Sequence, residues 1–177
     1  LRAVAMRMAD AVIVQNSAMA VQLAGEYPKA TIRFVPNWVD TDYFTPRYAT
    51  KTPKTVLYVG RLVEEKNLLA LATACYRTGA ILTCLGEGPL RDTLHQASRT
   101  TGVKINLPGA VPWGSLPRYY PEHAVFAMVS RTEGHCKSLI EAMAAGMACL
   151  VSKAVTEGMA PGINCLQVDG DATGIAL

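Results

Sequence analysis

The sequence predicts an α/β fold, a Rossmann-like parallel sheet flanked by helices. Short runs of apolar and β-branched residues alternate with longer segments of helical spacing along most of the 177 residues. The short runs are apolar without interruption, as in strands that are buried on both faces. A hydrophobic fraction of 50% with a charged fraction of 18% supplies enough apolar side chain for a full core.

The first part of the chain carries one such alternation and then a connector. We expect one helix and two strands here, at 17–24, 11–15 and 31–35. Ser17 is the expected N-cap of the helix. Residues 37–54 contain Pro46 and Pro53 and are rich in Asp, Asn and Thr, which is typical of a connector between two structural units.

A regular series of strands and helices follows the connector. We expect its strands at 55–59, 80–85, 103–107, 124–129, 148–152 and 165–168. We expect its helices at 67–77, 89–101, 116–123 and 138–145. Gly79, Gly102 and Gly146 stand where a left-handed residue closes the last turn of a helix. Pro89 and Pro117 suit a first helical turn.

Two cations flank the turn after the first strand of this series. Ligands in parallel α/β sheets bind beyond the carboxyl ends of the strands, so the residues there are the candidate site residues. Gly60 permits a sharp turn, and Arg61 and Lys66 together could neutralise a diphosphate. From composition alone, surface pairing of both cations with Glu64 and Glu65 is the better-supported interpretation.

Gly86 and Gly88 follow the next strand, in a loop that leads into a helix. The loop lacks the third glycine of the dinucleotide fingerprint, so an ordinary NAD-binding domain is the least favoured alternative. Taken alone, the two glycines are typical of a tight strand-to-helix turn and indicate a ligand-facing loop only weakly.

The segment after the fourth strand of the series is the most informative. Glu133 lies in the loop, and Glu141 lies on the first turns of the next helix. The amides from Gly134 to Ser138 form the helix N-terminus, which suits an anionic group. Hydrogen-bond donors for a phosphate beside hydrogen-bond acceptors for hydroxyl groups imply a sugar nucleotide. A helix cap, with Glu141 paired to Lys137 four residues earlier, explains the same pattern.

In order and spacing, these motifs resemble the retaining glycosyltransferases of family 4. The segments that carry the resemblance are residues 59–67, 85–91, 107–109 and 130–146. The resemblance implies the GT-B fold, in which two Rossmann-like domains face each other, and makes this chain its C-terminal half. It divides the chain into a remnant of the N-terminal domain, a linker, and a nucleotide-sugar-binding domain truncated at its C-terminus: residues 1–36, 37–54 and 55–177.

The resemblance also implies roles for the site residues. The catalytic residues would be Arg61, Lys66 and Glu133: the cations hold the donor diphosphate and stabilise its departure, and the glutamate faces the transferred sugar. Glu141 would bind the ribose hydroxyls. The remaining donor-binding residues would be Gly60, Gly86, Gly88, Gly134, His135, Cys136, Lys137 and Ser138.

The activity that the resemblance implies is hexosyl transfer with retention, by a mannosyltransferase or glucosyltransferase of polysaccharide biosynthesis. The donor would be a UDP-, GDP- or ADP-linked sugar, the acceptor a glycan, a lipid-linked or a small molecule, and no cofactor or metal is expected. The expected partners are the nucleotide sugar and the chain's own missing N-terminal domain, without which we expect no sugar transfer.

Charge and cysteine usage limit the remaining partners and the location. A net charge of +3 is too small to indicate nucleic acid. Five cysteines without a C-x-x-C pair indicate a reducing compartment with neither disulfides nor a zinc site. We therefore expect a cytoplasmic protein, or one peripheral at the cytoplasmic face of the membrane, where the acceptors of such transferases often lie.

One departure from the family pattern keeps other functions open. Val155 and Thr156 stand where the family usually has a glycine pair, and branched residues hinder the close approach of a phosphate to the backbone. This favours a non-catalytic module that binds a nucleotide sugar. Another nucleotide-sugar enzyme of the same two-domain plan, such as an epimerase or a phosphorylase, is the further alternative.

Overall fold

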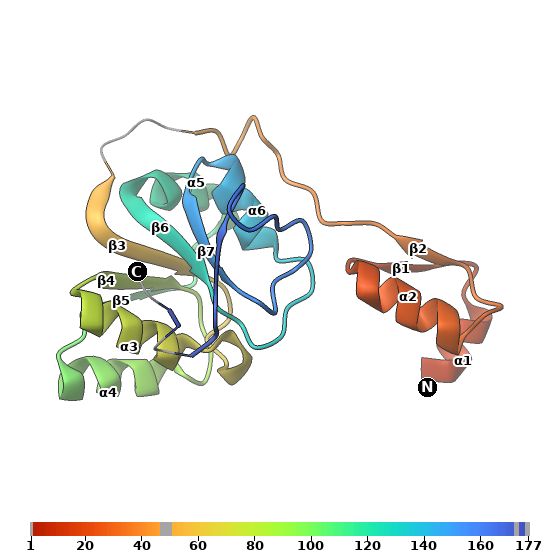
Figure 1. Ribbon diagram of the computed structural model, residues 1–177, viewed down its shortest axis with the longest axis horizontal. Helices are drawn as coiled ribbons and strands as arrows, with labels where there is room; N and C mark the ends of the chain where they lie inside the picture. The colour runs from red at the N-terminus through yellow and green to blue at the C-terminus, as the bar shows by residue number, and fades with distance from the viewer. Residues whose placement is uncertain (1, 47–50, 172–173, 176–177) are drawn as a thin grey trace.

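The computed structural model describes residues 2–46, 51–171 and 174–175, which form two units joined by an extended connector (Figure 1). The first unit consists of α1 (Arg2–Met8), β1 (Val12–Val14), α2 (Ser17–Glu26) and β2 (Ile32–Phe34). Its two strands pair in parallel, and a small apolar cluster around Met6, Val14 and Leu23 is its core. The second unit has a separate and much larger core.

A six-stranded parallel sheet is the centre of the second unit. Its strands are β3 (Thr52–Val59), β4 (Ile81–Leu85), β5 (Ile105–Gly109), β6 (His123–Met128), β7 (Ala148–Ser152) and β8 (Leu166–Val168). They lie in the order β5-β4-β3-β6-β7-β8, and every neighbouring pair is parallel. This arrangement confirms the predicted Rossmann-like sheet.

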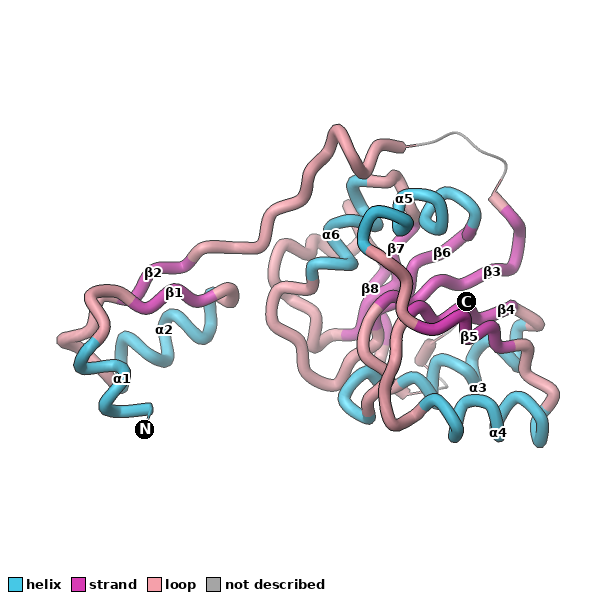
Figure 2. The backbone as a smooth tube through the Cα atoms, turned by 180° about the vertical axis from the view of Figure 1, so that it is seen from behind, coloured by secondary structure: helices cyan, strands magenta, loops and turns pink. Residues whose placement is uncertain are grey.

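Helices cover both faces of this sheet, as Figures 1 and 2 show from opposite sides. On one face lie α3 (Leu68–Thr78) and α4 (Arg91–Thr101), and on the other lie α5 (Leu116–Tyr119) and α6 (Lys137–Ala144). Gly79 and Gly102 close α3 and α4 in the left-handed conformation, as their positions predict. Short 3-10 helices at Glu64–Lys66, Trp113–Ser115 and Tyr120–Glu122 complete the unit.

Several element ends differ from prediction because contacts distant in sequence decide them. Strand β3 begins at Thr52, inside the expected connector, because Thr52 pairs with His123 on β6. The pairing of β3 with β6 shifts in register between Thr52 and Val56. Pro53, which has no amide hydrogen to donate, lies in this irregular stretch and not in the regular pairing. The expected helix at 116–123 stops early, and its last residue becomes the first of β6. Helix α1 is not among the predicted elements.

The expected N-cap of α2 was assigned to the wrong residue. Asn16 is the cap: its backbone is extended, and its side-chain oxygen accepts a hydrogen bond from the Met19 amide at 3.0 Å. Ser17 is the first helical residue, and its amide and hydroxyl both donate to Glu157 at 2.8 Å. The first unit therefore contacts the loop that follows β7.

The connector packs against the second unit before it reaches β3. Phe44 is only 1% exposed and belongs to the core of the second unit. Its ring meets those of Trp113 and Tyr120 edge to face, with centroids 5.5 Å and 5.7 Å apart. Within the described residues, none of the helices is both long and apolar enough to span a membrane.

Candidate functional site

The candidate site lies where the order of the strands reverses. From β3 the chain proceeds to β4 on one side of the sheet, and it later returns to β6 on the other side of β3. The loops that follow β3 and β6 therefore leave the sheet in different directions, which opens a crevice at their carboxyl ends. Arg61 and Lys66 follow β3, and Glu133 and Glu141 follow β6.

A cavity of about 400 Å³ occupies this crevice and brings most of the predicted residues together. The predicted residues that line it are Gly60, Arg61, Lys66, Glu133, His135, Cys136, Lys137, Ser138 and Glu141. Asn37, Val59, Trp113 and Met128 also line it, and these four were not predicted. The two cations and the two carboxylates thus share one cavity.

Lys66 is paired with Glu133 rather than with its sequence neighbours Glu64 and Glu65. Its Nζ lies 2.5 Å from Oε2 of Glu133, and the two side chains are 15% and 14% exposed. The Ser130 hydroxyl donates to the same carboxylate oxygen at 3.1 Å. Glu133 therefore fixes the position of the lysine ammonium through Oε2.

Tyr58 fixes the turn that carries Arg61. The Tyr58 hydroxyl donates to the Arg61 carbonyl at 2.8 Å, and a Cβ on Gly60 would lie only 2.7 Å from that hydroxyl oxygen. Burial raises the pKa of Tyr58 well above its ordinary value, so the hydroxyl remains a donor. The Arg61 side chain itself is exposed and accessible to an anion.

Glu141 is buried, and its partners differ from the Lys137 pairing that helical spacing allows. The residue is 2% exposed. Its Oε1 accepts from the Trp113 indole N–H and its Oε2 from the Tyr120 hydroxyl, both at 3.0 Å. Lys137 instead places its ammonium over the rings of Trp38 and Trp113, 5.5 Å and 5.9 Å from their centroids.

The start of α6 lines the cavity with Cys136, Lys137 and Ser138. Cys136 is the N-cap of this helix, and the first amides of a helix have no carbonyl partner within that helix. The Ser138 hydroxyl donates to the Val59 carbonyl at 2.8 Å, which holds this helix end against β3. Burial raises the pKa of the Cys136 thiol, while the hydrogen bond with Ser138 opposes the rise. The thiol therefore stays protonated, and we assign it no nucleophilic role.

His135 binds the connector. Its Nδ1 accepts from the Asn37 amide at 2.6 Å, and its carbonyl accepts from the Asn37 side chain at 2.5 Å. The Asn37 side-chain oxygen accepts in turn from Gln15 at 2.7 Å. His135 lines the cavity but also links the loop after β6 to the first unit.

Three predicted glycines lie outside this cavity. Gly134 lines a neighbouring crevice of about 540 Å³, together with Asn16, Met19 and Gln22 of the first unit. A Cβ on Gly86 would overlap the Gly60 carbonyl oxygen, and one on Gly88 would overlap that of Leu62. These two glycines let the loop after β4 pack closely against the loop after β3. They therefore support the loop that carries Arg61 and Lys66.

Alanine at position 86 should destabilise the second unit. Its Cβ would collide with backbone, which cannot rotate away, so we expect a loss of about 1–3 kcal/mol in the free energy of unfolding, as for other overpacked sites. Urea unfolding followed by circular dichroism measures it. Gly134→Ala is the matched control, because nothing lies within 4 Å of its Cβ, and we expect it to stay within about 0.5 kcal/mol. Equal stability of the two variants would contradict this packing role.

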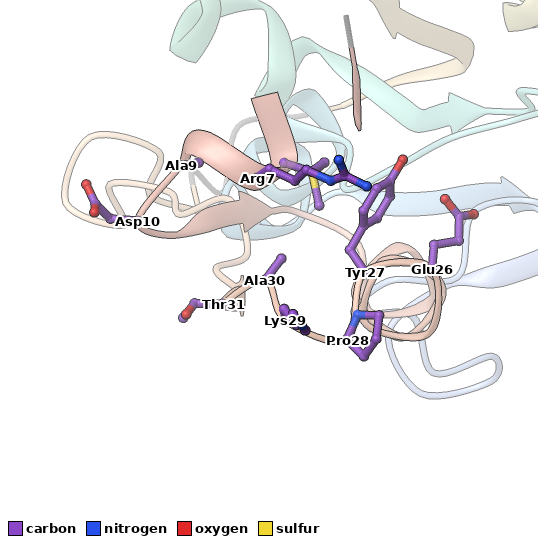
Figure 3. A pocket seen from close by; sticks show the side chains of 10 residues that line it. Arg7, Ala9, Asp10, Glu26, Tyr27, Pro28, Lys29, Ala30 and Thr31 are labelled. Atoms are coloured by element: carbon purple, nitrogen blue, oxygen red, sulfur yellow. The ribbon is translucent and has the colours of Figure 1, made fainter. Parts of the chain in front are cut away.

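A further cavity of about 570 Å³ lies in the first unit and contains none of the predicted site residues (Figure 3). It is lined by α1, the end of α2 and the segment before β2, with Arg7, Asp10, Glu26 and Lys29 among its residues. In the part of the chain that the structure describes, no three His, Cys, Asp or Glu side chains are grouped to hold a metal ion. All five cysteines are free thiols.

Fold and pocket together define a Rossmann-like α/β domain whose ligand site lies at the carboxyl edge of a parallel sheet. The family model described as "Glycosyl transferases group 1" matches residues 41–170. The chain therefore belongs to this family of glycosyltransferases. Its solved structural neighbours have the GT-B fold, of which the parallel sheet is a part.

Two curated relatives illustrate the family. The chain is 33% identical over 124 residues to a GDP-mannose-dependent alpha-(1-6)-phosphatidylinositol monomannoside mannosyltransferase of Mycobacterium tuberculosis, covering 60% of this chain and 32% of the relative. It is 26% identical over 162 residues to sulfoquinovosyl transferase SQD2 of Arabidopsis thaliana, covering 84% of this chain and 31% of the relative. The chain thus spans about a third of the length of these relatives.

Solved structures match nearly the whole chain. Sucrose-phosphate synthase from Thermosynechococcus elongatus superposes with a TM-score of 0.86 at 22% identity, over 99% of this chain and 49% of that one. Anabaena Alr3699/HepE in complex with UDP-glucose gives 0.85 at 18% identity, over 98% of this chain and 54% of that one. At these identities the likeness concerns the fold.

Proposed function

We propose that residues 55–177 bind a nucleotide-diphosphate sugar, from which the whole protein transfers a hexose with retention, as a family 4 enzyme. The shared cavity carries the proposal: Arg61, Lys66, Glu133 and Glu141 all line it. A diphosphate requires the cations, and sugar and ribose hydroxyls require the carboxylates. Retention and membership of family 4 are supported by the resemblance of the motifs.

The two cations are the groups that would lower the barrier to transfer. Negative charge grows on the departing diphosphate in the transition state, so cations that are already in place stabilise that state directly. Lys66 is held in place by Glu133, and Arg61 extends from a turn fixed by Tyr58. We propose that these side chains supply the positive charge, without a metal or a cofactor.

The carboxylates would orient the sugar nucleotide. Lys66 and Ser130 both bind Oε2 of Glu133, which leaves Oε1 for a hydroxyl of the transferred sugar. Glu141 would bind the ribose. The amides at the start of α6 would add neutral donors to the phosphate or the sugar.

The names of the relatives support a hexose donor. They include a GDP-mannose-dependent phosphatidylinositol monomannoside mannosyltransferase and a protein solved with UDP-glucose. We therefore propose GDP- or UDP-linked mannose or glucose as the donor and a glycan or lipid-linked acceptor. A lipid acceptor would place the protein in the cytoplasm at the membrane face.

We propose the crevice between α2 and the donor cavity as the approach route of the acceptor. Arg61, Lys66 and Glu133 line this crevice as well as the donor cavity, so a molecule bound there would reach the same groups. Asn16 and Gln22 face it from the first unit and suit hydroxyl groups. Residues 1–36 would then belong to the acceptor-side domain, with 37–54 as the linker.

Thermal unfolding of the full chain with GDP, UDP and ADP tests nucleotide binding. A ligand at 100 times its Kd adds about 2.7 kcal/mol to stability, which for a chain of this size raises Tm by about 5–10 °C. We expect such a rise with at least one nucleotide, and expect it to persist in EDTA. Arg61→Ala should abolish the rise, and Arg99→Ala, which changes a cation on α4, should not. No rise with any nucleotide would reject the proposal.

Sugar transfer by the whole protein separates the proposed enzyme from a non-catalytic binding module. The module would give the same thermal shift but release no nucleotide from GDP-mannose or UDP-glucose. Val155, which favours that alternative on sequence grounds, is 1% exposed and packs in the core of the second unit. The Val155 side chain therefore packs in the core. Its burial weakens the argument that this residue marks a module without catalytic activity.

A further inference from the structure

Two neutral donors from different elements fix the Glu141 carboxylate. Trp113, in the turn after β5, donates to Oε1, and Tyr120, after α5, donates to Oε2, each at 3.0 Å. Tyr120 is fully buried, and burial, followed by the charge of Glu141, raises its pKa far above the ordinary value. The phenol therefore keeps its proton and remains a donor. One acceptor position on each carboxylate oxygen is thus occupied.

One acceptor position on each oxygen remains for a ligand. An ionised carboxylate has about four lone-pair sites, and the indole and the phenol take two of them. Glu141 lines the cavity, so the other two are the positions that a bound molecule can reach. Two adjacent acceptors on one fixed group match two neighbouring hydroxyls, and a fixed group loses less entropy when it binds.

The connector holds Trp113 in the orientation that this contact needs. Tyr43 stacks on the indole, with centroids 4.6 Å apart and an interplanar angle of 14°. The Tyr43 hydroxyl donates to the Gly114 carbonyl at 2.8 Å, and Phe44 meets the indole edge to face. The direction of the indole N–H is therefore set by the segment between the two units.

We infer that Trp113 is a positioning residue of the nucleotide site, which acts through Glu141 on the ribose diol, and that Tyr43 of the connector supports it. This inference rests on the proposed function, in which Glu141 binds the ribose. The N–H of Trp113 holds Oε1 so that both carboxylate oxygens present an acceptor to the 2′- and 3′-hydroxyls together. Without the indole N–H, the carboxylate rotates and accepts a hydrogen bond from only one of the two hydroxyls at a time.

Calorimetric titration of the full chain with GDP and UDP, and with their 2′,3′-dideoxy forms, tests this role. We expect wild type to prefer the ribose form by about 10- to 100-fold, the range for hydrogen bonds to a charged group. Trp113→Phe keeps a ring for Tyr43 to stack on but removes the N–H. Its preference should fall to within about threefold, while its affinity for the dideoxy form stays within about twofold of wild type.

Two variants of Tyr43 provide a matched pair. Tyr43→Phe keeps the stacking and loses only the hydrogen bond to Gly114, so we expect it to keep the ribose preference. Tyr43→Ala removes the stacked ring, so we expect it to lose most of that preference. If Trp113→Phe does not fold, the Tyr43 pair decides the question on the same ratio.

Each other outcome has a definite meaning. An equal loss for ribose and dideoxy forms in Trp113→Phe would overturn the inference, because it would mean direct contact with the base or general support of the fold. An unchanged ratio would overturn it as well. Wild type that binds both forms equally would do the same, while the proposed nucleotide site would stand. Wild type that binds none of the four nucleotides would reject the proposed function itself.

Discussion

Lys66→Ala should lower the affinity of the chain for GDP or UDP about 100-fold and its free energy of unfolding by about 3 kcal/mol. The affinity falls because the variant lacks one of the two cations that we propose to hold the diphosphate, Arg61 and Lys66, both of which line the cavity. The stability falls because Glu133, only 14% exposed, loses the ammonium at 2.5 Å and is left with the hydrogen bond from the Ser130 hydroxyl among its contacts with the described residues. Urea unfolding and calorimetric titration measure the two effects on the same protein.

A second substitution separates the two effects. In Lys66→Met with Glu133→Gln, no charge is left without a partner, so most of the stability should return while the affinity stays low. Glu133→Gln alone frees the lysine from its carboxylate, so it should be less stable than wild type yet bind the diphosphate at least as tightly. If the double variant bound GDP and UDP as wild type does, Lys66 would not be a phosphate ligand.

An exposed ion pair between a lysine and an aspartate is the control for these changes. Lys153 lies 2.6 Å from Asp169, but these side chains are 68% and 61% exposed. Solvent screens exposed pairs, so Lys153→Ala should leave both stability and nucleotide affinity almost unchanged. The contrast between positions 66 and 153 would show that burial and place in the site, not the formation of an ion pair, cause the loss.

The sheet could be predicted because buried strands have a distinctive composition. Four consecutive residues of β4 are buried, and the last three of β6 are as well, which gives the uninterrupted apolar runs that the sequence shows. The ends of strands are harder to predict, because pairing decides them. Thr52 joins β3 only through its contact with His123 on β6.

The cations and carboxylates could be predicted from one rule, that ligands bind beyond the carboxyl ends of parallel strands. The same rule applied after β5 points to the turn that contains Trp113, which was missed. Pairings between distant residues carry no such signal. The motifs place Lys66 and Glu133 in one site, but no local pattern pairs Lys66 with Glu133 rather than with Glu64 and Glu65, because the adjacency of β3 and β6 brings the two side chains together.

Glu141→Gln should keep or raise the stability of the chain while its affinity for GDP or UDP falls about 10- to 100-fold. The glutamate is 2% exposed, and its carboxylate is bound by two neutral donors rather than a cation. An amide avoids the cost of burying the charge, because the indole can donate to its oxygen and the Tyr120 hydroxyl can accept from its nitrogen. We expect a gain of up to about 2 kcal/mol in the free energy of unfolding.

The affinity falls because an amide offers fewer acceptors than a carboxylate. Its nitrogen is a donor, so only one of the two ribose hydroxyls keeps an acceptor, and the bond to it is no longer charge-assisted. The opposite signs of the two effects are the test, because a buried charge that costs stability is kept for binding. Glu122→Gln, at an exposed glutamate, is the control and should change neither quantity. A Glu141→Gln variant that lost stability and bound nucleotides as wild type does would make Glu141 a residue of the fold and not of the site.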